Sequence, residues 1–132
     1  MSEYLLDTNI ASYIIKGSTA VRRRLAALPI EDIAISCVTE GELRYGVARL
    51  PDNTRLKTIV EAFLLLVNIH PWDSAAAQCY GPLRARMEAA GNGLANLDAM
   101  IAAHALSRGS VLITHDKAFA RVKGLVLEDW TK

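Results

Sequence analysis

Residues 4–9 carry the sequence Tyr4-Leu5-Leu6-Asp7-Thr8-Asn9, an apolar run that ends at a carboxylate. The run is too short for a helix and predicts a buried strand that closes at Asp7. A short helix is expected from about Ile10 to Gly17, whose missing Cβ suits a helix end. An ionised carboxylate beside buried residues needs a compensating partner. Asp7 is therefore either the cap of the following helix or part of a functional site.

The rest of the chain alternates short apolar runs with segments of helical periodicity. This alternation predicts an α/β fold with a parallel sheet of about five strands and helical crossovers. The helix expected after Arg55 places Ile59, Phe63 and Leu66 on one face. Strands are expected over residues 4–6, 33–37, 66–70, 110–114 and 125–127, and the later helices over 21–28, 39–50, 55–65, 73–91 and 97–107.

Composition favours one globular domain over residues 1–132, since 52% of the residues are hydrophobic and 22% are charged. The 15 Lys and Arg against 14 Asp and Glu give a formal net charge of +1, so any nucleic-acid affinity must be local. Cys37 and Cys79 lack a Cys-x-x-Cys spacing, and the N-terminus lacks a signal-peptide pattern. The apolar stretch over 59–69 is interrupted by Glu61 and is too short to cross a bilayer. These features favour a soluble protein of the reducing cytoplasm.

Three further acids lie, like Asp7, where a predicted element begins or ends. Glu42 is expected in the first turn of a helix, as is Asp98, and Asp116 lies just past a buried-looking strand. Parallel strands present their carboxyl ends at one edge of the sheet, so these acids can meet in space. Their meeting point would be a site for a hard cation.

Structural roles compete with this interpretation. Asp7 and Asp116 suit the caps of helices or turns. Glu42 completes a capping box that begins at Thr39, in which the acid only satisfies a backbone donor. Glu40 is the solvated alternative to Glu42, because two residues lie about 200° apart on a helix.

Asp98 shares a helix face with Ile101 and Ala105, which turn toward the core. A favourable interaction with the helix N-terminus, with Asn96 as cap, explains its position along the helix but not its inward face. Four independent structural acids would also have to gather at one edge by coincidence. One divalent cation accounts for the gathering, because like charges held close together otherwise repel.

The chemistry of the donors selects the metal. All four candidate ligands are oxygen donors without a Cys or His at zinc-like spacing, which favours Mg²⁺ or Mn²⁺ over Zn²⁺. His115 is adjacent to Asp116 but consecutive residues diverge, and His70 and His104 are expected to be structural. The sequence has no Gly-x-Ser-x-Gly elbow, no phosphate-binding Gly-x-x-x-x-Gly-Lys loop and no Gly-x-Gly-x-x-Gly.

Four motifs in this order and spacing resemble the PIN-domain ribonucleases, specifically the VapC toxins of bacterial type II toxin–antitoxin pairs. The resemblance covers essentially the whole chain, through the closing Leu127-Glu128-Asp129-Trp130. Each motif alone is weak, and the specificity comes from the combination. The motifs are Leu5-Leu6-Asp7-Thr8-Asn9, Ser36-x-x-Thr39-x-x-Glu42-Leu43, Leu97-Asp98-Ala99-Met100-Ile101-Ala102 and Thr114-x-Asp116-x-x-Phe119.

The resemblance implies a three-layer α/β/α fold and a Mg²⁺- or Mn²⁺-dependent endoribonuclease. The matching catalytic and metal positions are Asp7, Glu42, Asp98 and Asp116, and Asn9 and Thr114 correspond to supporting polar neighbours. It also implies a homodimer, inhibition by a cognate VapB-type antitoxin, and a structured RNA such as tRNA as substrate. Contact with DNA is expected only through the antitoxin. His115 departs from the family, where Asn, Arg or Gly is more usual.

Surfaces for these partners have weaker signals. Side chains that could contribute to a dimer or antitoxin contact are Tyr13, Ile14, Tyr45 and Leu64. The candidate phosphate contacts are the cations Arg22, Arg23, Arg24, Arg44, Arg49, Arg84, Arg86, Lys117, Arg121 and Lys123, most of which are expected on solvated helix faces.

Other functions remain open at this point. A haloacid-dehalogenase-like phosphatase needs a second Asp two residues after the first, where this chain has Asn9. A phosphoacceptor receiver domain needs an acid after a central strand, where His70 and Pro71 stand. A non-catalytic RNA- or protein-binding module with the same fold is the third alternative, and the intact acids weigh against it.

Overall fold

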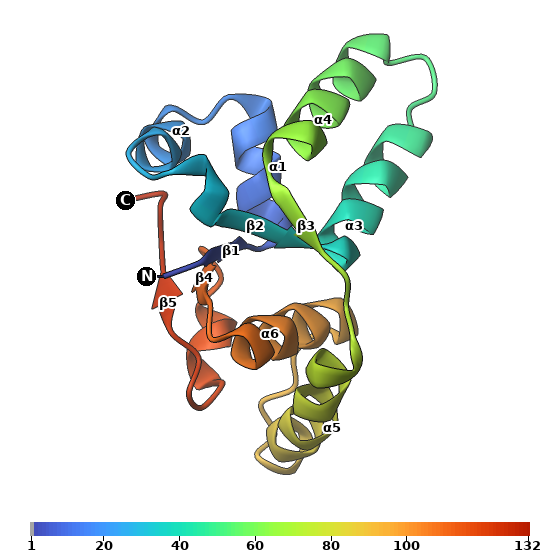
Figure 1. Cartoon of the computed structure of the whole chain (residues 1–132). Helices are drawn as coiled ribbons and strands as arrows, with labels where there is room; N and C mark the ends of the chain where they lie inside the picture. Colours follow the sequence, from blue (N-terminus) through green and yellow to red (C-terminus); the bar gives the residue numbers. More distant parts are fainter. Residues whose placement is uncertain (1) are drawn as a thin grey trace.

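Five parallel strands form one sheet in the computed structural model, which describes residues 2–132 (Figure 1). The spatial order is β3-β2-β1-β4-β5, and every neighbouring pair is parallel. This confirms the expected α/β fold and parallel sheet. The strands are β1 (Tyr4–Leu6), β2 (Ile33–Ser36), β3 (Asn68–His70), β4 (Val111–Ile113) and β5 (Leu127–Glu128).

Helices cover both faces of the sheet and make the three layers that Figure 1 shows from the side. One face carries α1 (Thr8–Lys16), α2 (Thr19–Ala26), α3 (Cys37–Ala48) and α4 (Thr54–Leu66), and the other carries α5 (Ser74–Ala89) and α6 (Asn96–Arg108). Two 3₁₀ turns, η1 (Ile30–Asp32) and η2 (Lys117–Arg121), complete the elements among residues 2–132. None of the helices in this range is both long and apolar enough to cross a membrane.

The alternation of side chains along each strand builds two cores. In β1, Leu6 packs into the core beneath α1 and α4, whereas Leu5 packs into the core beneath α5 and α6. In β4, Ile113 and Leu112 divide in the same way. Because these strands are buried on both faces, they are continuous apolar runs in the sequence.

Four strands differ in their bounds from the sequence expectation, and one of them, β4, is shorter by one residue at each end. The second strand ends at Ser36, because its hydroxyl accepts a hydrogen bond from the Val38 N–H (3.1 Å) and starts α3 at once. The third begins at Asn68, because α4 continues through Leu66. The last is Leu127–Glu128, after a turn at Gly124, whose φ of +85° favours glycine.

The strand order changes direction between β1 and β4, and the switch point lies at their carboxyl ends. The chain leaves β1 toward β2 on one side, while β4 returns on the other side, so the connections diverge there. Open α/β sheets bind ligands at such a switch point. The backbone N–H of Asp7 donates to the Ile113 carbonyl (3.0 Å), which holds the two strand ends together at this switch point.

Candidate active site

Asp7 lies at the end of β1 and is 4% exposed. Its Oδ1 accepts a hydrogen bond from the Ile10 N–H (2.8 Å), so the expected helix cap is confirmed. The Thr114 hydroxyl, from the end of β4, also donates to this carboxylate. The cap therefore fixes the side chain without neutralising it.

Burial raises the pKa of Asp7 above its ordinary value of 3.8. The hydrogen bonds from Thr114 and Ile10 act in the opposite direction, because they stabilise the charged form. The negative charges of Asp98 and Asp116 raise the pKa further. Three of the four candidate acids are therefore close enough to interact.

Asp98 lies in the first turn of α6 and is partly buried, on the side of Ile101 and Ala105, which are buried. The cap position of α6 is Ala95, which makes no side-chain hydrogen bond, so the expectation of an Asn96 cap is wrong. Burial raises the pKa of Asp98, and the charges of Asp116 and Glu42 add to this effect.

Glu42 lies in the second turn of α3, and the expected capping box with Thr39 is wrong. The cap lies three residues earlier than expected, at Ser36, so Thr39 is inside the helix and buried. The Thr39 hydroxyl is 3.1 Å from the Thr8 hydroxyl at the start of α1. Glu42 is only partly exposed and acts electrostatically on Asp98, whereas Glu40 pairs with Arg44 at 2.9 Å.

Asp116 is exposed and caps η2, where its Oδ1 accepts from the Ala118 N–H (2.9 Å). The Asp116 N–H in turn donates to the Thr114 hydroxyl (3.0 Å). Thr114 thus links Asp7 and Asp116. Asn9, the other residue expected to support the acids, is exposed and makes no side-chain hydrogen bond within residues 2–132.

The structure brings the four acids into one electrostatic group at the switch point. Asp98 is its centre, since its pKa responds to Asp116 and Glu42 and its charge acts on Asp7. Among residues 2–132, no group of three His, Cys, Asp or Glu side chains is arranged to hold a metal ion by itself. Carboxylate oxygens are ligands that hard divalent cations accept, so these side chains can contribute ligands to a metal site.

The three histidines make their contacts with groups other than the four candidate acids. His115 Nδ1 lies 2.9 Å from Asp129 Oδ2, toward the C-terminal segment. His70 pairs with Glu3, and His104 Nδ1 contacts the Ser36 hydroxyl at 2.8 Å in the interior. Burial lowers the pKa of His104, which suits a neutral structural ring.

Comparison with known proteins identifies the family. The PIN domain profile matches residues 4–125. The chain belongs to the PIN-domain family. This PIN domain is 36% identical over 132 residues to the tRNA(fMet)-specific endonuclease VapC of Shigella flexneri, with 99% of this chain and all of the relative covered. It is 34% identical to ribonuclease VapC2 of Rickettsia felis, with 98% of each chain covered. It is thus a VapC-type endoribonuclease of the toxin–antitoxin class.

Solved structures agree with this placement of the PIN domain. DNA-bound VapBC from Salmonella typhimurium superposes with a TM-score of 0.92 at 33% identity, covering 98% of this chain and 99% of that one. VapBC2 from Rickettsia felis, bound to a DNA fragment from its promoter, gives 0.90 at 32% identity, covering 96% and 98%.

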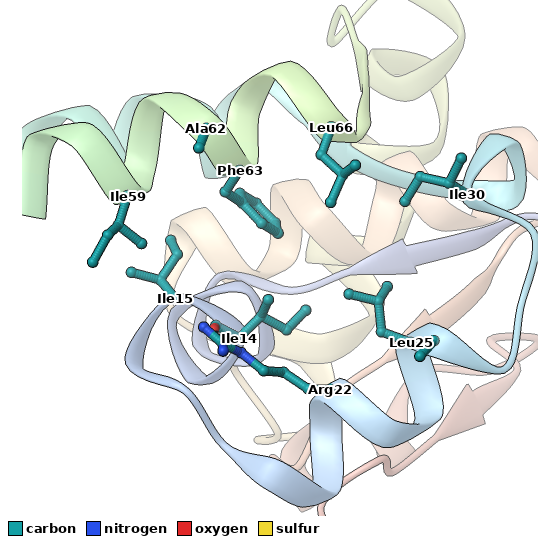
Figure 2. Close-up of a pocket in the computed structure, with 10 residues that line it drawn as sticks. Ile14, Ile15, Arg22, Leu25, Ile30, Ile59, Ala62, Phe63 and Leu66 are labelled. Atoms are coloured by element: carbon teal, nitrogen blue, oxygen red, sulfur yellow. Dashed lines mark hydrogen bonds between the residues drawn. The ribbon is translucent and has the colours of Figure 1, made fainter.

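One feature of the PIN domain was not located from the sequence. An open apolar cavity of about 620 Å³ lies between α1, α2 and α4, as Figure 2 shows. Of the contact residues suggested by the sequence, only Ile14 lines it, whereas Leu64 is buried and Tyr45 is exposed elsewhere. The sequence feature that could have located this cavity is the helix face shared by Ile59, Phe63 and Leu66, because all three line it.

Proposed function

We propose that this PIN domain, acting as one unit over residues 1–132, cleaves RNA with Mg²⁺ or Mn²⁺ held by Asp7, Asp98, Glu42 and Asp116. The observation that carries the proposal is that burial raises the pKa of Asp7 and of Asp98 and that the repulsion from the neighbouring acids adds to this effect. A cation relieves that repulsion, and hard oxygen donors suit these two metals.

The bound metal would lower the pKa of a water and neutralise charge on the scissile phosphate. The side chains have separate tasks. Asp7 is held in one orientation by Ile10 and Thr114, so it can direct a water without reorganising. Asp98 is the alternative for this role, because its carboxylate interacts electrostatically with both Asp7 and Glu42. Hydrolysis would leave a 5′-phosphate and a 3′-hydroxyl.

An RNA-cleavage assay with the purified protein, in Mg²⁺ or in EDTA, tests the metal site. We expect cleavage to stop in EDTA and to fall at least about 10²-fold in Asp7→Asn and in Asp98→Asn. Asp73→Asn is the matched control, because Asp73 caps α5 in the same way (3.1 Å to the Ala76 N–H) outside the acidic group. Activity that survives EDTA and both substitutions would sink the metal mechanism.

The four acids should differ in their importance. Asp116 is exposed and already bonded to the η2 backbone, so Asp116→Asn should keep more activity than Asp98→Asn. Raising the Mg²⁺ concentration should restore part of the activity of Asp116→Asn. The loss of this exposed ligand should lower the affinity for the metal more than the rate of the metal-bound protein. A titration of initial rate against Mg²⁺ measures this, and equal, unrescued losses would refute the ranking.

A structured RNA such as tRNA is the proposed substrate. The support is the full-length Shigella relative, whose name specifies tRNA(fMet). Mapping of new 5′ ends after incubation with total cellular RNA should reveal one tRNA cut at one position. Uniform cleavage of all RNA would reject tRNA specificity while leaving the nuclease activity in place.

A VapB-type antitoxin is the proposed partner, seated in the apolar cavity of Figure 2. The support is that the superposed relatives are VapBC complexes and that the cavity is walled by Ile59, Phe63 and the 54%-exposed Leu66. An apolar helix face suits such a groove. Any contact with DNA would come through this partner.

Leu66→Glu tests the antitoxin site in co-purification with the product of the neighbouring reading frame. We expect the complex to be lost, because a charge would be buried in an apolar contact. The control is Leu65→Glu, since Leu65 is 87% exposed and lies outside the cavity. Equal binding by both variants would exclude this groove.

We also propose that the protein works as a homodimer in the cytoplasm, where its RNA substrate is found. Light scattering coupled to size-exclusion chromatography decides between the 14.4 kDa monomer and twice that mass.

A further inference from the structure

A second, smaller cavity of about 160 Å³ lies between the end of α5 and η2. Three cations line it, Arg86 from α5 and Arg121 and Lys123 from the segment at the end of η2, together with the amide of Asn92. Leu83 and Met87 form its apolar floor, and no carboxylate lines it. The cavity is thus basic in a protein whose net charge is only +1.

The three cations have no internal partner. Within residues 2–132, none of Arg86, Arg121 and Lys123 forms an ion pair or a side-chain hydrogen bond, and all three are exposed. Arg84, two residues before Arg86, instead pairs with Glu88 at 2.9 Å. Like charges held around one cavity repel, so the arrangement favours a bound anion.

The basic cavity lies beside the candidate active site. Asp116 caps η2 and Arg121 ends it, so the two are on the order of 10 Å apart at a rise of about 2 Å per residue. Leu83 and Met87 also border a neighbouring hollow that reaches Ala99, next to Asp98. An RNA strand that is cut at Asp98 and Asp116 can therefore pass over η2 to the cavity.

We propose that Arg86, Arg121 and Lys123 bind a backbone phosphate of the RNA a short distance from the cleaved bond. The inference rests on the proposed function and adds a substrate-positioning site to it. The cavity is smaller than a typical small-molecule site, and guanidinium groups match phosphate oxygens in bidentate geometry. Phosphate contacts of this kind fix the register of a nucleic acid. The three side chains should therefore act on RNA affinity and not on the chemical step.

The test is the triple variant Arg86→Gln, Arg121→Gln and Lys123→Gln. Its control is Lys16→Gln, Arg55→Gln and Lys57→Gln, which removes the same charge from exposed cations on α1 and α4, across the sheet. Cleavage of bulk tRNA in Mg²⁺ gives KM and kcat. Binding of labelled tRNA, with Asp7→Asn added to each protein to prevent cutting, gives Kd at several salt concentrations.

We expect KM and Kd of the cavity variant to rise about tenfold or more with kcat within about twofold. The salt slope of binding should fall by about 1 for each phosphate interaction that the substitutions remove. The control should match wild type. Equal KM and equal salt slope in both triple variants would overturn the proposal, as would a collapse of kcat at unchanged KM. A wild type that neither binds nor cuts RNA would instead overturn the proposed function, and this site with it.

Discussion

Asp7 fills one of the two roles that the sequence offers for it, that of a helix cap. It caps α1 through the Ile10 N–H, and it is also the most buried of the four acids. Capping satisfies one oxygen but leaves a charge that burial, Asp98 and Asp116 all disfavour. The proposed role in the active site would account for a carboxylate kept in such an environment, because active-site groups often lower stability in exchange for function.

Asp7→Asn should therefore stabilise the metal-free protein. The raised pKa means that the folded state binds the Asp7 proton more tightly than the unfolded state does. This contribution is fully present below the ordinary pKa of 3.8 and is lost as the pH rises through the folded value. Asn caps helices as well as Asp, so we expect a gain of about 0.5–2 kcal/mol at pH 7 that disappears in acid.

Urea unfolding in EDTA at pH 7 and near pH 3 measures this gain. Asp73→Asn is again the control and should change stability by less than about 0.5 kcal/mol, because its cap is preserved and it lies outside the acidic group. Added Mg²⁺ should stabilise wild type more than Asp7→Asn, since only the intact site binds it well. A variant less stable than wild type at pH 7 would contradict the assigned repulsion.

At the scale of elements, the position at which α3 begins explains why the sequence pattern predicted Glu42 in the first turn of the helix, whereas it lies in the second. Thr39 and Glu42 have capping-box spacing, but β2 runs into α3 without a loop, and Ser36 ends the strand and caps the helix. A fully buried strand next to a helix gives no polar boundary in the sequence. The Ser36 side chain also contacts His104, 68 residues away, and no local pattern can reveal such a contact.

Ser36→Ala should destabilise the fold more than an ordinary cap deletion. It removes the hydrogen bond to Val38 N–H and leaves the buried His104 Nδ1 without its partner, so we expect a loss of about 2–4 kcal/mol. Ser18→Ala removes only the longer cap of α2 (3.4 Å) and should cost about 1 kcal/mol or less. Denaturant midpoints compare the two variants, and equal losses would deny His104 a structural role.

At the scale of the whole molecule, local patterns predicted the parallel sheet but not the surfaces. The alternation of strands and helices is a property of short segments, so it is visible in the sequence and places the acids at one edge. The shared face of Ile59, Phe63 and Leu66 was also visible. Periodicity is the same for a core and for an open groove, however, so only the structure separates them.

Glu3 is a long-range contact that no local pattern could predict. Its carboxylate accepts hydrogen bonds from Arg108 Nε and Ser110 Oγ, each at 2.8 Å, and lies 2.8 Å from His70 Nε2. These partners are 67 to 107 residues away in the chain. The contact joins the start of β1 to β3, to the end of α6 and to β4.

Glu3→Gln should weaken the whole fold in a pH-dependent way. Burial alone would raise the pKa of Glu3, but the hydrogen bonds from Arg108, His70 and Ser110 prevail and lower it from 4.5 to about 2. A lowered pKa stabilises the fold above 4.5, and this stability is lost as the pH falls toward 2. A shift of this size corresponds to about 3 kcal/mol, which partial exposure reduces to about 1–2 kcal/mol.

Urea unfolding should therefore separate Glu3→Gln from wild type at pH 7 and bring the two proteins together near pH 2. The control is Glu31→Gln, which should follow wild type throughout, because Glu31 is exposed and its side chain has no partner within residues 2–132. A gap between Glu3→Gln and wild type that stays constant from pH 7 to pH 2 would assign the effect to packing and not to charge.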